Sequence, residues 1–186
     1  VVTVTNAVAI TGTAAEVTAA LVTAGSLVVV SDAAVTITGN PTITELNDIA
    51  AKTTGVVTAT LAAASLTALG SLDTASTDDI TITVNDADDA AVTAANLSTL
   101  GGKTAGTVTV SNAVAITGDH DQVTAALVTA GTKVSAGTAT VTVNDADATA
   151  ITAAELSDIG GATTGTVTVT NAVAITCLLY TSDAAD

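Results

Sequence analysis

The sequence predicts an α/β protein folded as a right-handed solenoid of strand–turn–helix coils, each of about 25 to 33 residues. The strands of successive coils are expected to stack into one parallel sheet. Three observations lead to this prediction. Long segments recur at a fixed spacing, each repeat switches from alternating to helical hydrophobic periodicity, and the composition offers small and branched side chains for a core. Hydrophobic residues make up 48% of the 186 residues and aromatic residues 1%, which favours a thin core with closely spaced layers.

Long segments of the sequence recur at one fixed spacing. TVTVSNAVAITG at Thr107 returns as TVTVTNAVAIT at Thr166, so the spacing is 166 − 107 = 59. TITVNDADDAAVTAANLSTLGG at Thr81 returns as TVTVNDADATAITAAELSDIGG at Thr140, and 140 − 81 is again 59. Each repeat unit divides into two coils, because the second valine of the strand, or an alanine in its role, recurs at Val4, Val30, Ala59, Val84, Val110, Val143 and Val169.

Each coil is predicted to begin with a strand and to continue into a short helix. Residues 2–5 alternate Val with Thr, which places Val inward and Thr outward. An Asn or Asp step and a short apolar stretch follow, as in Asn6 and residues 7–10. The helix then starts at a capping box, in which two side chains satisfy free backbone amides. Capping boxes are predicted at Thr13–Glu16, Thr42–Glu45, Asp119–Gln122 and Thr152–Glu155.

The helices are predicted to bury one apolar face and to stop at glycine. The expected inward residues are Val17, Leu21, Leu46, Ile49, Leu97, Val123, Leu127, Leu156 and Ile159. A glycine follows each helix and is expected to take the left-handed conformation of a helix stop. These glycines are Gly25, Gly55, Gly70, Gly101, Gly131 and Gly160.

The charge and composition of the chain limit the kinds of partner that it is expected to bind. The net charge is −15, with three Lys and no Arg. Phosphate binding needs clustered cations, so neither nucleic acid nor an anionic membrane surface is an expected partner. No apolar run approaches the ~20 residues that span a bilayer, so no membrane insertion is expected. Because the chain starts in mid-pattern at VVTVTN, we expect an internal piece of a longer protein, whose first partners are flanking repeats of the same chain.

The last ten residues, CLLYTSDAAD, differ in amino-acid composition from the repeats. They hold the single cysteine, Cys177, and the single aromatic residue, Tyr180. One codon choice back-translates them to TGT CTC TTA TAC ACA TCT GAC GCT GCC GAC, which resembles read-through into a transposon-type sequencing adapter. We therefore predict a single repeat domain over residues 1–176 and a non-native tail over 177–186, with a native tail as the alternative. Without Asp183 and Asp186 the charge is −15 + 2 = −13, and no thiol remains for a disulfide or a metal site.

The coil resembles a leucine-rich repeat in outline, with Val in place of Leu and an Asn directly after the strand, although the leucine spacing of that family is missing. In composition, residues 1–176 are more similar to the Thr/Ala/Val-rich repeat arrays of very large bacterial surface and adhesin-like proteins. The resemblance implies a structural or adhesive segment located outside the cell or at its surface. An enzyme is not expected, because the sequence shows no catalytic triad, phosphate loop or pair of buried carboxylates in a pocket.

Polar residues after the strands are candidates for a ladder between coils. Asn6, Asp32, Asn112 and Asn171 follow their strands at matching positions. Such side chains commonly bond backbone groups at turns, so a structural Asn/Asp ladder is the favoured interpretation and a row of ligands is the alternative.

Two acidic clusters are candidates for calcium. They contain Asp86, Asp88 and Asp89 in one coil, and Asp145 and Asp147 in a later one. Calcium takes six to eight oxygens, which two or three carboxylates and nearby carbonyls could supply. Solvated turn residues are the favoured interpretation, and a calcium-dependent adhesin module is the alternative.

One histidine, His120, lies between two acidic residues at a predicted helix start. An exposed residue of the capping turn is the favoured interpretation, with metal binding as the alternative.

The outward strand threonines are the most regular predicted surface feature. They are Thr3, Thr5, Thr58, Thr60, Thr83, Thr109, Thr142, Thr168 and Thr170. Strand propensity alone favours threonine on an exposed face. A stiff, flat array of them would resemble the faces of ice-binding solenoids, so ice or a crystalline surface is an alternative partner. We expect Thr3 and Thr168 to lie on one face of one sheet.

Overall fold

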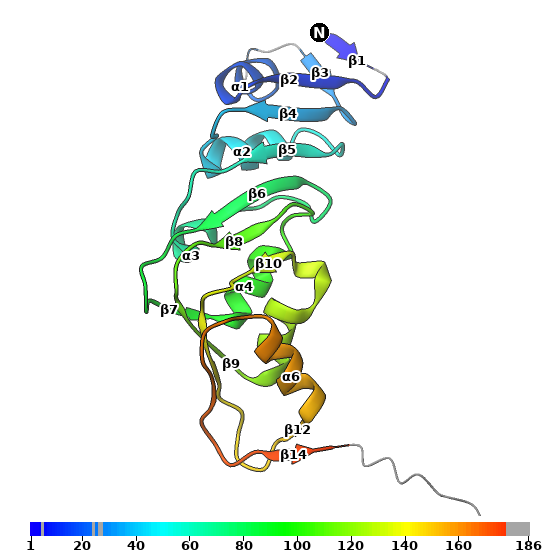
Figure 1. Cartoon of the computed structure of the whole chain (residues 1–186). Helices are drawn as coiled ribbons and strands as arrows, with labels where there is room; N and C mark the ends of the chain where they lie inside the picture. The colour runs from blue at the N-terminus through cyan, green and yellow to red at the C-terminus, as the bar shows by residue number, and fades with distance from the viewer. Residues whose placement is uncertain (5, 24, 26–27, 178–186) are drawn as a thin grey trace, which may run out of the picture.

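The structure is a computed structural model that describes residues 1–4, 6–23, 25 and 28–177. Its elements follow one another along one long axis, from β1 at one end to β14 at the other (Figure 1). The strand pairs among the described residues are all parallel. This confirms the predicted mixture of helices with parallel sheets. Within the predicted tail, Cys177 is exposed and residues 178–186 lie outside the described part of the chain.

The strands form two sets. The first set contains the predicted Val/Thr strands, which are β1 (Val2–Val4), β3 (Val28–Val30), β5 (Val57–Thr60), β6 (Asp79–Val84), β8 (Val108–Val110), β11 (Thr140–Val143) and β13 (Val167–Val169). It also contains β10 (Val134–Ser135), a strand that was not predicted. The second set follows the Asn/Asp turns: β2 (Ala9–Thr13), β4 (Ala34–Thr38), β7 (Ala91–Thr93), β9 (Ala115–Gly118), β12 (Ala150–Thr152) and β14 (Ala174–Thr176). The sequence analysis did not predict this second set. Its alternation is nevertheless present, since Val35 and Ile37 are buried while Thr36 and Thr38 are exposed.

The prediction of a single sheet is wrong, because the strands of the described residues form four sheets. Their orders are β1-β3, β10-β8-β6-β5-β4-β2, β13-β11-β9-β7 and β12-β14. At β5, pairing passes from the second set to the first, since Thr58 pairs with Thr36 of β4 on one side and with Asp79 of β6 on the other. Thr3 in β1 and Thr168 in β13 therefore belong to different sheets, contrary to expectation.

The helices are short, and four of them begin at the predicted capping boxes. They are α1 (Ala14–Leu21), α2 (Ile43–Ala50), α3 (Leu66–Leu69), α4 (Ala94–Gly101), α5 (His120–Val123) and α6 (Ala153–Gly161), and α5 continues through a π-helical turn (Thr124–Val128) and a 3₁₀ turn (Ala130–Thr132). All four predicted capping boxes are confirmed. In one of them the Glu45 amide donates to Thr42 Oγ1 over 3.2 Å, and the Thr42 amide donates to Glu45 Oε2 over 2.9 Å.

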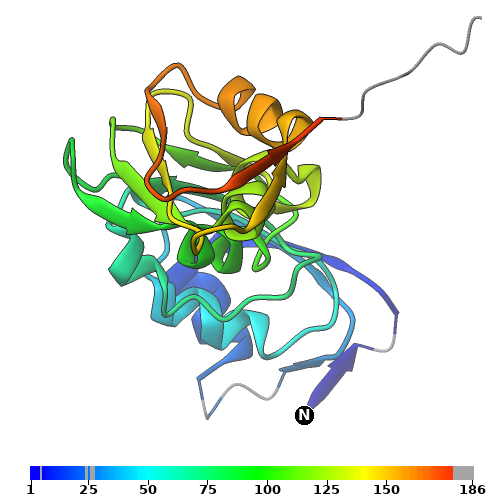
Figure 2. The ribbon, with the colours of Figure 1, turned by 90° about the horizontal axis from the view of Figure 1, so that it is seen from below.

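The predicted inward helix residues pack against the strands. Leu127 and Leu156 are half-buried, and the other seven are buried. Among the largest fully buried side chains are Leu46, Ile82 and Ile116, so branched aliphatic groups fill the core. Seen from below, successive helices are displaced around the long axis and do not superpose (Figure 2).

Three Thr-x-Gly corners join neighbouring coils, at Thr53–Gly55, Thr104–Gly106 and Thr163–Gly165. In each corner the threonine Oγ1 accepts from the glycine amide, over 3.0, 2.8 and 3.0 Å respectively. The same hydroxyls donate to carbonyl oxygens of the preceding coil: Ala33, Asp78 or Ile80, and Ala139. A single side chain thus satisfies backbone groups of two coils.

The glycines that were predicted to be left-handed helix stops have a different conformation. Among the described glycines, Gly39 is the one with positive φ, 82°, so the expected left-handed helix stops are wrong. Gly70, for example, has φ −58°. A Cβ on Gly55 would instead lie 2.3 Å from the Ala33 carbonyl oxygen, and one on Gly101 would lie 2.2 Å from that of Thr132. These two glycines allow backbones to approach closely.

Candidate functional site

The predicted threonine array is distributed over several sheets. Thr3, Thr60, Thr109, Thr168 and Thr170 are exposed; Thr58, Thr83 and Thr142 are half-buried; Thr5 lies outside the described residues. The register pairs Thr83 with Thr109 and Thr142 with Thr168, whereas Thr3 pairs with Val29. The nine predicted threonines therefore do not form one grid.

Longer threonine ladders arise because the second strands contribute to them. Thr93, Thr117, Thr142 and Thr168 stand in register across β7, β9, β11 and β13. Thr11, Thr36 and Thr58 form a shorter ladder across β2, β4 and β5. Four threonines of these ladders were not predicted, although each ends an Ala-Ile-Thr or Ala-Val-Thr segment whose alternation is a strand signal: Thr11, Thr36, Thr93 and Thr117.

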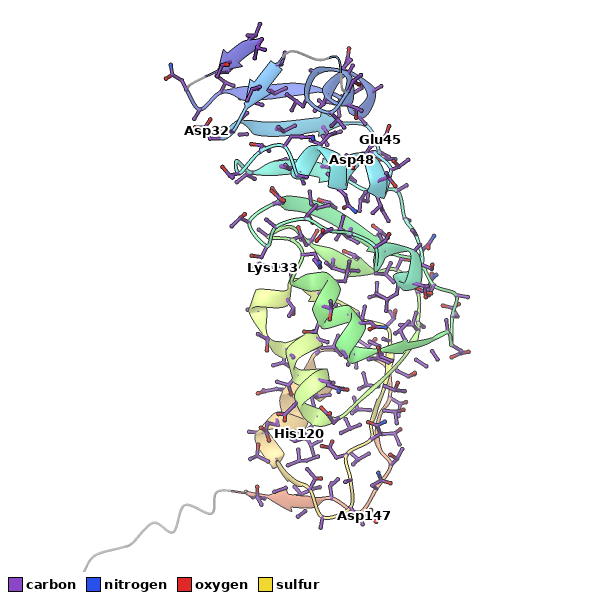
Figure 3. All side chains as sticks on the ribbon, turned by 180° about the vertical axis from the view of Figure 1, so that it is seen from behind. Asp32, Glu45, Asp48, His120, Lys133 and Asp147 are labelled. Carbon is purple, nitrogen blue, oxygen red and sulfur yellow. The ribbon has the colours of Figure 1, made fainter. Side chains whose placement is uncertain are left out.

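The faces of the stack turn around its long axis. Asp32 and Asp147 both lie in turns between a first and a second strand, yet they lie on opposite sides of the stack in one view (Figure 3). Sheets twist with a fixed hand, so strands several coils apart present differently oriented surfaces. The two threonine ladders consequently belong to separate surfaces.

The two acidic clusters bond backbone groups of the coils on either side. Asp86 Oδ2 accepts from the Leu66 amide over 2.7 Å, in the coil before it. Asp88 Oδ1 accepts from the Ala113 amide over 2.9 Å, in the coil after it. Asp89 has a left-handed backbone, with φ 60°, at the turn itself. The carboxylates of this cluster therefore diverge.

The second cluster repeats this arrangement one repeat unit later. Asp145 Oδ2 accepts from the His120 amide over 2.8 Å, and Asp147 Oδ1 accepts from the Ala172 amide over 3.1 Å. Among the described residues, no three His, Cys, Asp or Glu side chains are grouped as a metal site requires.

The predicted Asn/Asp ladder residues lie at the turns between the paired strands. Asn112 Nδ2 donates to the Asp86 carbonyl over 2.6 Å, and Asn171 Nδ2 donates to the Asp145 carbonyl. Asn6 and Asp32 are exposed at the corresponding turns of the first two coils. Asn112 and Asn171 thus bridge a coil to the preceding one.

His120 differs from the sequence expectation because its side chain is 13% exposed. Its Nδ1 lies 2.7 Å from Asp145 Oδ1, and its Nε2 lies 3.5 Å from Asp121 Oδ1. Because an ionised carboxylate can only accept hydrogen bonds, we assign the proton to Nδ1 of His120, which then donates to Asp145 Oδ1. Asp145 therefore holds both the backbone amide and the imidazole of His120. Their separation in the sequence, one coil length, was the signal that could have predicted this pair.

The His120–Asp145 pair borders an open depression of about 670 Å³ on the surface. Its walls include Thr93 and Thr117 of the longer ladder and the acidic side chains of Asp119 and Asp121. The hydrogen bond from His120 to Asp145 raises the pKa of His120 above its ordinary value of 6.5. Burial is the second largest effect on this pKa and lowers it, whereas the charges of Asp145, Asp121 and Glu155 each raise it by less.

No family model matches the sequence, and no curated protein or solved structure matches it either. Among the described residues, the longest helix has nine residues, and none is long and apolar enough to cross a bilayer.

A fall in stability with rising pH is the expected consequence of the His120–Asp145 pair. The raised pKa means that the folded chain binds the proton more tightly than the unfolded chain. The stabilisation is therefore complete below about pH 6.5 and is lost as the pH rises through the folded value. The melting temperature should therefore fall as the pH rises above about 6.5. Scanning calorimetry at several pH values measures it.

A matched control comes from the earlier coil, where Leu66 takes the place of His120 above Asp86. His120→Leu should flatten the melting temperature between pH 6 and 8, since no other histidine is present. Asp86→Asn should lower the melting temperature and leave its pH dependence unchanged. A pH dependence that persists in His120→Leu would contradict the assignment.

Calcium is expected to leave the melting temperature within about 1 °C of its value in EDTA. A ligand that binds the folded state must raise stability by mass action, and the carboxylates of Asp88 and Asp147 already accept backbone amides. A rise of several degrees in millimolar calcium that Asp88→Asn abolishes would show a site in these clusters.

Proposed function

We propose that this chain is a non-catalytic structural or adhesive repeat segment of a large secreted or cell-surface bacterial protein, folded as a right-handed α/β solenoid. One observation carries the proposal. The residues best suited to chemistry, the buried or half-buried Asp and Thr side chains at the turns, bond the backbone of neighbouring coils. Asp78, for instance, is 3% exposed and its Oδ1 accepts from the Val57 amide over 2.8 Å. This arrangement allows further coils to be added to the stack, because each coil supplies hydrogen-bond partners for the backbone of its neighbour.

Insertion of one more repeat unit tests this proposal. Val143 corresponds to Val84, so a second copy of residues 84–142 placed after Thr142 leaves every local junction unchanged. Each coil adds one strand spacing of about 4.8 Å, so two coils should lengthen the particle by about 10 Å at constant cross-section. Small-angle X-ray scattering measures both dimensions, and urea unfolding should show higher stability. A wider particle of unchanged length would refute a linear array.

Binding of ice or a crystalline surface is the second candidate function, favoured by the four-membered ladder of Thr93, Thr117, Thr142 and Thr168. Neighbouring strands place these β-branched side chains about 4.8 Å apart in few rotamers. Thermal hysteresis and ice recrystallisation assays test it with Thr93→Tyr and Thr168→Tyr, which place bulky side chains at the two exposed ends of the ladder. Thr67→Tyr, on the exposed side of α3, is the matched control. Absence of activity, or equal activity in Thr168→Tyr, would exclude this function.

A further inference from the structure

The third coil, residues 57–78, has a much shorter helix than its neighbours. Its helix α3 has four residues, whereas α1, α2 and α4 have eight and α6 has nine. At 1.5 Å per residue, α3 is about 6 Å long, about half the length of α2 and α4. The other four-residue helix, α5, is extended by the π-helical turn that follows it, but residues 71–78 after α3 contain neither helix nor strand. The helical side of the stack is therefore thin at this one interior coil.

The sheet side of the third coil is complete. β5 pairs in parallel with β4 on one side and with β6 on the other, through Thr58 and Ala59 among others. Ala59 is buried, and so are Leu66 and Leu69 of α3. The strands therefore carry the continuity of the stack through this coil.

Two hollows border α3 and the segment after it. One, of about 170 Å³, lies between α3 and α4 and is lined by Leu66, Leu69 and Leu100 among others. The other, of about 210 Å³, lies between the end of α2 and residues 73–78. Elsewhere the helices pack directly, α1 on α2 and α4 on the π-helical turn, whereas α2 and α3 hardly touch. Close packing resists deformation, so the helical side resists it least at the third coil.

Solvent-exposed polar groups span the helical side of this coil. Asn47 of α2 donates through Nδ2 to the Ser71 carbonyl over 2.9 Å, and its Oδ1 accepts from the Asp73 amide over 2.8 Å. On the other side, Lys103 Nζ lies 3.4 Å from Asp73 Oδ1, and the Asp73 side chain is 85% exposed. An ion pair this exposed contributes little to stability. These contacts can break and reform in water without opening the core.

We propose that the third coil is a hinge, about which the coils before it and the coils after it tilt as two stiffer blocks. Parallel strands can tilt about the line of their hydrogen bonds without breaking them, while the two hollows close or widen. Packed elements on both sides of a thin connection are the usual construction of a hinge. The inference goes beyond the proposed function, because a rigid array and a jointed array would both be structural repeats.

Double electron–electron resonance between spin labels on the full chain tests the hinge. Thr44, Ala95 and Ala154 are the second residues of α2, α4 and α6, and all three are exposed. With the exposed Cys177 replaced by serine, labels at Thr44→Cys and Ala95→Cys span the third coil, and labels at Ala95→Cys and Ala154→Cys span α5 as the matched control. The first distance distribution should be about twice as broad as the second. Equal widths would overturn the proposal.

Two variants should change the width in opposite directions. Asn47→Ala removes both hydrogen bonds to residues 71–73, so it should broaden the distribution across the third coil and leave the control pair unchanged. Thr99→Leu, at an exposed position on the wall of the hollow between α3 and α4, adds apolar surface there and should narrow it. A width that neither variant changes would arise from the labels or from motion of α2 itself, and would refute the hinge.

Discussion

Replacement of Gly106 by alanine is expected to lower the free energy of unfolding by about 3 kcal/mol or more, one of the largest effects of any single methyl group in this chain. A Cβ at this position would lie 2.4 Å from the carbonyl oxygen of Ile80 and 2.9 Å from Asp79 Oδ1. Ile80 belongs to β6, which pairs with β5 on one side and β8 on the other, so its carbonyl cannot retreat without disturbing the pairing of three strands. Urea unfolding monitored by circular dichroism measures the loss.

The control for Gly106→Ala is Gly160→Ala in α6. No atom lies within 4 Å of the position that a Cβ on Gly160 would take. Alanine also has the higher helix propensity, by about 1 kcal/mol, so this variant should be as stable as the parent chain or more stable. If the two alanine variants have the same stability, the close approach at Gly106 does not constrain the stack.

The contrast between these glycines shows why part of the fold could be predicted from the sequence and part could not. Capping boxes such as Thr42–Glu45 are local, since both partners lie within one helical turn and the signal is complete in the sequence. The role of Gly106 depends on the backbone of Ile80, which is distant in the sequence and belongs to another coil. Gly55 shows the same dependence, because it was predicted to be a left-handed helix stop, whereas the Ala33 carbonyl of another coil leaves no room for a Cβ there.

The same limit applies to the candidate site. The repeat showed that Asp86 and Asp145 occupy equivalent positions, and their density suggested calcium. Whether carboxylates converge on an ion or diverge to separate amides depends on the register between coils. That register places the amides of Leu66 and His120 beside them. The second set of strands was not predicted for a related reason. A segment as short as Ala34–Thr38 gives only a weak strand signal in the sequence, and pairing with a neighbouring strand stabilises it.

Thr104→Val is expected to lower the free energy of unfolding by about 3 kcal/mol while preserving the shape of the side chain. Thr104 is 2% exposed, and its Oγ1 accepts from the amides of Ile80 and Gly106, each over 2.8 Å. The hydroxyl also lies 2.9 Å from two carbonyl oxygens of the preceding coil, to which it can donate. Valine leaves two buried amides without a partner, and each unsatisfied group costs about 1–3 kcal/mol.

Two further variants separate the hydroxyl of Thr104 from its packing. Thr104→Ser keeps the hydrogen bonds and removes one methyl group, so it should cost only about 1 kcal/mol. Thr109→Val makes the same chemical change as Thr104→Val on an exposed strand face and should stay within about 0.5 kcal/mol of the parent. Hydrogen exchange gives an independent measurement, because the amides of Ile80 and Gly106 should exchange faster in Thr104→Val than in Thr104→Ser. Equal stability of these two Thr104 variants would mean that packing, and not the hydroxyl, joins the coils at this corner.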